Sequence, residues 1–220
     1  MDQNLAYDDI EHEQPFLKII AKIISYVLHP LFIPTYVFIW SAWRFPETFS
    51  GITSAGMMFK KISVFLNASF FPAFAVFLLW RLKFIESIYL RTQKDRIIPY
   101  IITMIFYWWM WYLSRGFEDQ PEVLKFFYFG IFLTTVFGLI INNFFKISMH
   151  AMGAGSILAF LILTCFYYQT FFGTDILAVT LLAGLICTAR LLLNEHSTAE
   201  IYTGLIVGIL CQLLGLWIAM

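Results

Sequence analysis

Residues 201–220 read IYTGLIVGILCQLLGLWIAM and contain no Asp, Glu, Lys or Arg. A helix needs about 20 such residues to cross a bilayer, because the hydrocarbon core is about 30 Å thick and each helical residue rises about 1.5 Å. This stretch therefore predicts a transmembrane helix. The rest of the chain can be divided in the same way, by reading from one charged residue to the next.

The composition of the whole chain is that of a membrane protein. Of its 220 residues, 60% are hydrophobic and only 13% are charged, whereas soluble domains average about 45–50% and about 25%. A soluble domain of this composition would expose large apolar patches and aggregate. The 14 basic and 14 acidic side chains cancel, so the net positive field that nucleic-acid binding needs is missing. We expect an integral membrane protein that binds membrane lipids and no nucleic acid.

Six further apolar stretches precede residue 201. They cover residues 23–43, 62–80, 97–114, 126–145, 151–172 and 176–193. The sixth stretch meets Arg190 after 14 residues and crosses the bilayer only if its helix continues to about residue 193. Together with the last stretch they therefore predict an all-α polytopic bundle of six or seven transmembrane helices. In the first stretch Pro30 and Pro34 predict a kink, and the carbonyl groups that a proline frees inside a membrane need partners from neighbouring helices.

The predicted spans form one domain. No linker or low-complexity segment interrupts residues 23–220, so we expect a single transmembrane helical domain there. Residues 1–22 combine a polar, acidic tail with an amphipathic segment, PFLKIIAKII, which starts at residue 15. We expect this segment to lie along the membrane surface, as amphipathic helices with basic residues do.

Seven spans divide the connecting loops between the two sides of the membrane. The loops at residues 81–96, 142–150 and 190–200 share one side, and those at 44–61, 115–125 and 173–175 share the other. The first side carries His150, His196 and Glu200. It also carries five basic residues, namely Arg91, Lys94, Arg96, Lys146 and Arg190. The candidate site is therefore a cluster of ionisable residues at one membrane face.

The most informative part of this cluster surrounds the start of the last helix. Arg190 lies inside the sixth predicted span, where a charge is costly and a functional partner is expected, with snorkelling to the interface as the alternative. His196 and Glu200 are four residues apart and share a helix face. The carboxylate could hold one imidazole nitrogen and leave the other nucleophilic. Ser197 and Glu200 also fit a capping box, which would give Glu200 a purely structural role.

A second group of residues precedes the fifth predicted helix. The N-terminus of a helix binds anions through its unpaired N–H groups. Lys146 would add a charge to such an anion site, Ser148 a hydroxyl group, and His150 a proton donor. For His150 the alternative is an interfacial histidine whose ring is hydrogen-bonded by the backbone.

The spacing at the last helix resembles the third signature of the type 2 phosphatidic acid phosphatase superfamily. That signature is Ser-Arg, five residues, His, three residues, Asp. The corresponding residues here are Ala189-Arg190, His196 and Glu200. The order of the clusters along the chain and their shared membrane face also match the family, and the resemblance covers residues 90–200.

The other two signatures of the family are divergent in this chain. The second, Pro-Ser-Gly-His, is similar to residues 147–150, which keep only Ser148 and His150. The first, Lys, six residues, Arg-Pro, is similar in composition and position to residues 91–99 but differs in spacing.

The resemblance implies a role for each residue of the cluster. His196 would be the nucleophile that forms a phosphohistidine, Glu200 would orient it, and His150 would be the general acid for the leaving alcohol. Phosphate oxygens would be bound by Arg190, Ser148 and Lys146, with Arg96, Lys94 or Arg91 in place of the first signature's pair. The family implies neither a metal ion nor another cofactor.

These observations predict a membrane phosphatase that acts on a lipid phosphate or a polyprenyl diphosphate. The alternative is a catalytically weakened phospholipid-binding or scaffold protein on the same fold. A transporter is less favoured, because only the kinked first span suggests a discontinuous helix. Gly204 and Gly208 have the GxxxG spacing, which permits a homodimer, although we favour packing within the chain.

The side of the membrane on which the site lies stays open. Lys and Arg are more numerous on the site side, which the positive-inside rule assigns to the cytoplasm. This excess disappears once the five proposed ligands are set aside. Many bacterial members of the family face outward, so the resemblance favours the outer face of a bacterial inner membrane.

Overall fold

The computed structural model describes residues 15–219, and the predicted polar tail over residues 1–14 lies outside that range. Seven helical segments of the described chain are long and apolar enough to cross a membrane. The predicted all-α membrane fold is therefore confirmed, and each of the seven apolar stretches overlaps one of these segments.

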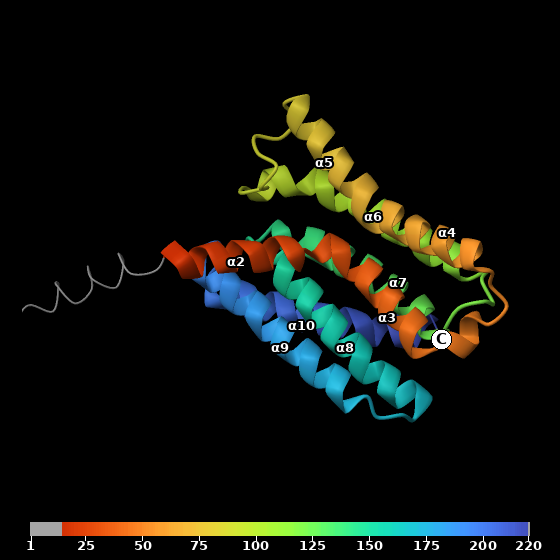
Figure 1. Cartoon of the computed structure of the whole chain (residues 1–220). Coiled ribbons are helices and arrows are strands. Elements are labelled where there is room, and N and C mark those ends of the chain that lie inside the picture. Colours follow the sequence, from red (N-terminus) through yellow and green to blue (C-terminus); the bar gives the residue numbers. More distant parts are fainter. Residues whose placement is uncertain (1–14, 220) are drawn as a thin grey trace, which may run out of the picture.

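The first two spans are composite, and the other five are single helices (Figure 1). The first contains α2 (Pro15–Val27), the 3-10 helix η1 (Pro30–Phe32) and α3 (Ile33–Arg44). After the 3-10 helix η2 (Pro46–Phe49), the second contains α4 (Ser54–Phe65), the π-helical turn η3 (Leu66–Phe70) and α5 (Phe71–Arg81). The single helices are α6 (Gln93–Ser114), α7 (Val123–Asn142), α8 (Met149–Tyr168), α9 (Gly173–Leu192) and α10 (Thr198–Ala219).

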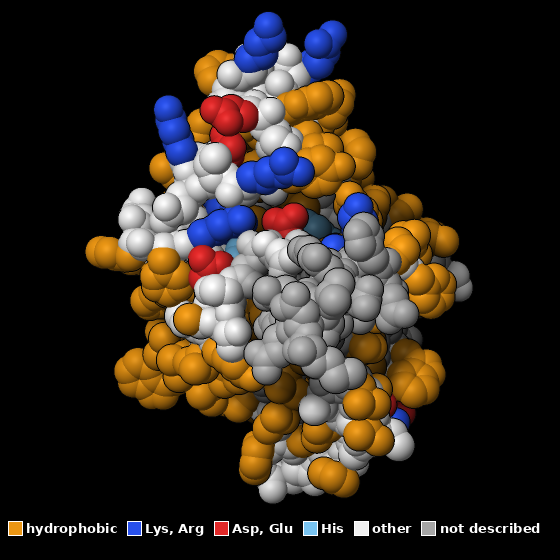
Figure 2. Space-filling model, turned by 90° about the vertical axis from the view of Figure 1, so that its left-hand side faces the viewer, with side chains coloured by type: hydrophobic (Ala, Val, Ile, Leu, Met, Phe, Trp, Pro, Cys, Tyr) orange, Lys and Arg blue, Asp and Glu red, His pale blue; other side chains and the backbone are white. Residues whose placement is uncertain are grey.

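Large apolar side chains cover the outside of the bundle. Trp43, Leu181 and Trp217, for example, are 68%, 61% and 80% exposed. In water such a surface would drive aggregation, whereas the lipid tails of a bilayer are an apolar solvent for it. Figure 2 looks onto the end of the bundle where α2 begins, and it shows charged side chains across this end with hydrophobic ones around them.

Helices α8 and α10 pack closely because glycines face the backbone of the partner helix. A Cβ atom on Gly204 would lie 2.8 Å from the carbonyl oxygen of Ser148, and one on Gly208 would collide with the carbonyl oxygen of Met152. The predicted packing of the GxxxG residues within the chain is therefore confirmed. These two glycines are not free to contact a second copy of the protein.

The first span breaks where its prolines predict. Helix α2 ends at Val27, and His29 is extended (φ −64°, ψ 138°), as the residue before a proline usually is. Three carbonyl groups near the break accept hydrogen bonds from side chains. The bonds join His150 Nε2 to Ser25 O (3.1 Å), Tyr36 Oη to Val27 O (2.7 Å) and Ser69 Oγ to Leu31 O (2.7 Å).

Helix α2 is longer than the sequence pattern indicates. It begins at Pro15 and contains the amphipathic residues that were expected to lie along the membrane surface. The predicted domain boundary between residues 22 and 23 thus falls inside this helix, because no Pro or Gly interrupts residues 16–27. These residues form one helical segment with the start of the first span.

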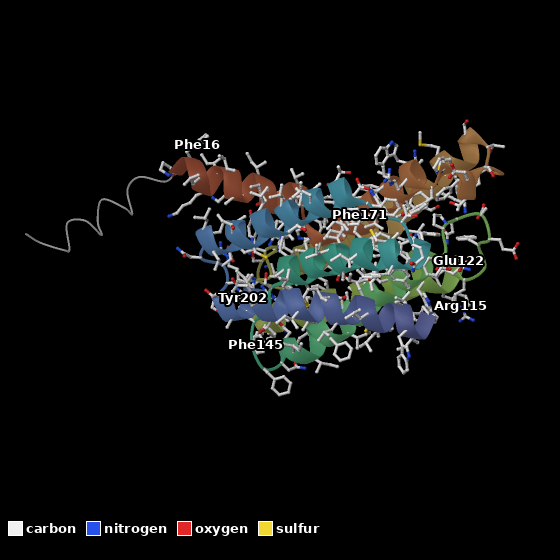
Figure 3. All side chains as sticks on the ribbon, turned by 90° about the horizontal axis from the view of Figure 1, so that it is seen from below. Phe16, Arg115, Glu122, Phe145, Phe171 and Tyr202 are labelled. Atoms are coloured by element: carbon white, nitrogen blue, oxygen red, sulfur yellow. The ribbon has the colours of Figure 1, made fainter. Side chains whose placement is uncertain are left out.

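The loops that carry the predicted site residues lie at one end of the bundle. Those after α5, α7 and α9 are at the left in Figure 1, and those after α3, α6 and α8 are toward the right. Figure 3 agrees, since Phe145 and Tyr202 lie toward the end marked by Phe16, whereas Arg115 and Glu122 lie toward the opposite end. The predicted division of the loops is therefore confirmed.

Candidate functional site

The start of α10 holds His196 against Glu200. His196 Nδ1 lies 2.9 Å from Glu200 Oε2, and the same oxygen accepts a hydrogen bond from the backbone N–H of Ser197 at 3.1 Å. Ser197 Oγ accepts in return from the N–H of Glu200 at 3.3 Å. The capping box and the histidine contact therefore coexist on one carboxylate oxygen. Because an ionised carboxylate only accepts, Nδ1 carries the proton and Nε2 keeps its lone pair.

The electrostatics around His196 favour a neutral ring. The residue is 8% exposed, and its burial is the main reason that its pKa falls from the ordinary 6.5 to about 4. The bond to Glu200 opposes this fall, whereas Arg96, Arg190 and Lys146 reinforce it. We call these three basic residues the cationic cluster. At neutral pH the imidazole of His196 is uncharged, which is the form that can act as a nucleophile.

Arg190 lies in the last turn of α9 and points into the site. Its Nη2 is 3.7 Å from Glu195 Oε2, and its Nη1 donates to Ser25 Oγ at 3.5 Å. Its side chain is only 12% exposed, so it does not reach outward as a snorkelling arginine would. Its buried Nε has no hydrogen-bond partner in the described chain. The guanidinium therefore keeps a donor for an anion.

Lys146 and Ser148 lie in the loop between α7 and α8. Lys146 Nζ donates to the carbonyl oxygen of Glu195 at 3.2 Å. Burial, and secondly the charge of Arg96, lower the pKa of Lys146. Ser148 is fully buried and caps α8, with its Oγ accepting from the N–H of Ala151 at 3.4 Å. Lys146 thus belongs to the cationic cluster, while Ser148 positions the start of α8.

His150 is held by the first span. Its Nε2 donates to the carbonyl oxygen of Ser25 at 3.1 Å, and its ring packs edge-on against that of His29, with 5.0 Å between the centroids. The backbone bond that was the alternative interpretation is therefore present, and it leaves Nδ1 available. Sequence reasoning assigned no role to Ser25 or His29. Pro30 is the only sequence feature that points to these two residues. It ends the helix in which the Ser25 carbonyl would otherwise accept a backbone hydrogen bond.

Of the three basic residues expected to replace the first signature, only Arg96 joins the cluster. It is 3% exposed, and it donates from Nε to Leu90 O and from Nη1 to Ile147 O, both at 2.8 Å. Arg91 and Lys94 are exposed. Within residues 15–219 neither forms a hydrogen bond or an ion pair with another predicted site residue. They lie at the same membrane face but outside the cluster.

The assembled site is suited to an oxyanion. The three cations of the cluster face two carboxylates, those of Glu195 and Glu200, so one positive charge is left over for an anion. Glu195 is a further residue that sequence reasoning left without a role, although it binds both Arg190 and Lys146. Among residues 15–219, no group of three or more His, Cys, Asp or Glu side chains is placed to hold a metal ion.

Comparisons with known proteins bring no assignment from outside. No family model, no curated protein and no solved structure matches this chain. A function can therefore be argued only from the geometry and the chemistry of the residues themselves.

Proposed function

We propose that this protein is a membrane-embedded phosphatase that hydrolyses a lipid phosphate or polyprenyl diphosphate through a phosphohistidine. The observation that carries the proposal is His196, a buried neutral imidazole held at Nδ1 by Glu200 and surrounded by the cationic cluster. A nucleophile fixed by a carboxylate beside several cations is suited to phosphoryl transfer, because catalysis of that reaction depends on positioning and charge stabilisation.

The first chemical step is attack on the substrate. His196 Nε2 forms a bond to phosphorus as the bond between phosphorus and the lipid oxygen breaks. Glu200 stabilises the positive charge that the ring of His196 acquires, since its Oε2 accepts from Nδ1. Arg96, Lys146 and Arg190 stabilise the charge on the equatorial phosphate oxygens.

His150 supplies the proton for the leaving group. Its Nε2 is used by the Ser25 carbonyl, so the transferred proton is the one that the imidazolium form carries on Nδ1. The neutral ring that remains can then take a proton from water at the same nitrogen. That water attacks the phosphohistidine, which releases inorganic phosphate and restores His196.

One observation favours the alternative of a weakened phospholipid-binding protein. Glu195 contacts two of the three cations. Its carboxylate forms an ion pair with Arg190, and its backbone carbonyl accepts a hydrogen bond from Lys146. A substrate phosphate would have to compete with these contacts. The alternative predicts phosphate-lipid binding without turnover, and a direct assay separates the two.

The test is phosphate release by the purified full chain from a panel of lipid phosphates in detergent micelles. We expect release and a radiolabelled phosphoenzyme that is acid-labile, as phosphohistidine is. His196→Ala should abolish both and leave lipid binding intact. Lys94→Ala, which changes an exposed cation at the same face, should change neither. Full phosphate release by His196→Ala would rule out the proposed nucleophile, and lipid binding by a wild-type protein that releases no phosphate would favour the alternative.

A further inference from the structure

A cavity of about 350 Å³ lies next to the candidate site, between the first five spans. Its volume falls in the range of about 300–1,000 Å³ that small-molecule sites occupy. Four prolines line it, one or two from each of the first three spans, namely Pro30, Pro34, Pro72 and Pro99. Proline has a fixed φ and no rotatable side chain, so these walls are rigid.

The lining of the cavity is suited to hydrocarbon. None of the described residues that line it is an Asp, Glu, Lys or Arg. The hydroxyl groups of Thr103, Thr134 and Thr135 all donate to backbone carbonyls of their own helices, at 2.7–2.8 Å. Their protons are therefore already used. Tyr100 also lines the cavity, and its buried hydroxyl has no hydrogen-bond partner in the described chain. A charged ligand group would still lose its hydration here with little compensation, because one hydroxyl cannot replace a hydration shell.

The cavity adjoins the residues that would bind phosphate. His29 lines it, and the ring of His29 packs edge-on against that of His150. Leu90 also lines it, and the Leu90 carbonyl accepts the hydrogen bond from Arg96 Nε. The cavity is therefore separated from His150 and from Arg96 of the cationic cluster by one residue in each case, His29 and Leu90.

The cavity is also in reach of the lipid phase. Ala73 and Phe77 on α5 line it, and both are exposed on the outside of the bundle, Phe77 by 47%. A hydrocarbon chain could enter between α5 and its neighbours without leaving the apolar part of the bilayer.

We propose that this cavity binds the hydrocarbon chain of the phosphorylated lipid and holds one chain only, so that the protein selects single-chain over two-chain lipid phosphates. The inference rests on the proposed function. One water occupies about 30 Å³ of liquid, and a methylene group is of similar size. The cavity therefore holds about a dozen such groups, which is enough for one chain of moderate length and too few for two.

This selection works through shape. A chain that moves from the bilayer into the cavity gains little hydrophobic free energy, because lipid tails are as apolar as the lining. A two-chain lipid could place one chain in the cavity, but its second chain would have to pass the rim beside Ala73. The rigid proline walls restrict how far the cavity can widen.

The experiment compares three phosphates with wild type and two variants of α5. The substrates are dodecyl phosphate, a phosphatidic acid and butyl phosphate. Ala73→Phe fills the cavity, and Ala75→Phe is the matched control, because Ala75 lies on the same helix and does not line the cavity. In wild type, kcat/KM for dodecyl phosphate should exceed that for phosphatidic acid at least about tenfold. Ala73→Phe should lower kcat/KM for dodecyl phosphate by a similar factor and leave kcat/KM for butyl phosphate unchanged.

A second measurement does not depend on turnover. Dodecyl phosphate with a photoreactive diazirine at its chain end should label lining residues such as Val76 and Thr103. Ala73→Phe should abolish that labelling and Ala75→Phe should retain it. Equal kcat/KM for one-chain and two-chain lipids, or labelling confined to residues outside the cavity, would overturn the inference. Loss of phosphate release from all three substrates with cavity labelling retained would overturn the proposed function alone.

Discussion

Glu200 is predicted to have separable catalytic and structural roles, and Glu200→Gln tests the catalytic one. In the structure Glu200 Oε2 accepts from both His196 Nδ1 and the N–H of Ser197. An amide oxygen can still accept both bonds, and Gln also serves at this capping-box position. It cannot neutralise the imidazolium that forms as His196 attacks. A hydrogen bond to a charged group contributes about 1.5–3 kcal/mol and a neutral one about 0.5–1.5 kcal/mol, so the exchange should cost about 1–1.5 kcal/mol and lower turnover about 5- to 13-fold.

Two further variants separate the helix-capping role of Glu200 from its contact with His196. Ser197→Ala removes the reciprocal cap and should cost about 0.5–2 kcal/mol of stability with His196 still held. Glu200→Asp keeps the charge but is one methylene group shorter, so it should keep more turnover than Gln and have a lower melting temperature than wild type. Turnover and thermal unfolding are measured for all three variants in one detergent. Unchanged turnover in Glu200→Gln would refute the orienting role.

Two further predictions concern the cations and pH. Arg96→Lys should raise KM for a lipid phosphate at least about tenfold, because it removes a buried guanidinium. The control Arg91→Ala should leave KM close to the wild-type value. Equal effects of the two substitutions on KM would place Arg91 in the site. Folded His196 has a pKa of about 4 against an ordinary 6.5, so between these values the unfolded chain binds more protons and stability is lost as the pH falls. The melting temperature of wild type should therefore drop more between pH 6.5 and pH 4 than that of His196→Gln, and parallel curves would contradict the assigned protonation.

The spans could be predicted from the sequence because bilayer thickness fixes the length of an apolar helix. Their ends could not, since a charged residue need not end a helix. Lys18 and Lys22 lie within α2 with exposed side chains, and Lys60 and Lys61 lie within α4. Lysine near a membrane surface extends its ammonium group to water while its backbone stays helical. When the spans are delimited by charged residues, the predicted starts of both composite spans are therefore too late in the sequence.

The site was predictable where its parts are close in sequence. His196 and Glu200 meet because they are four residues apart on one helix, and Ser197 caps the same turn. The contacts of Ser25 with His150 and Arg190 join residues that are 125 and 165 positions apart. They depend on how the first span packs against α8 and α9, which no local pattern encodes. Arg91 and Lys94 show the converse, because these sequence neighbours of Arg96 are exposed whereas Arg96 is buried in the cluster.

The break in the first span links the fold to the chemistry of the site. A carbonyl group without a partner costs several kcal/mol inside a membrane, so the break at Pro30 is tolerated only if other side chains reach it. His150 on α8 is one of those side chains, and it reaches the Ser25 carbonyl only after the bundle has assembled. The same bond fixes the ring of His150 and directs its Nδ1 away from Ser25. A helix defect that would destabilise an isolated span therefore orients a candidate acid in the assembled protein.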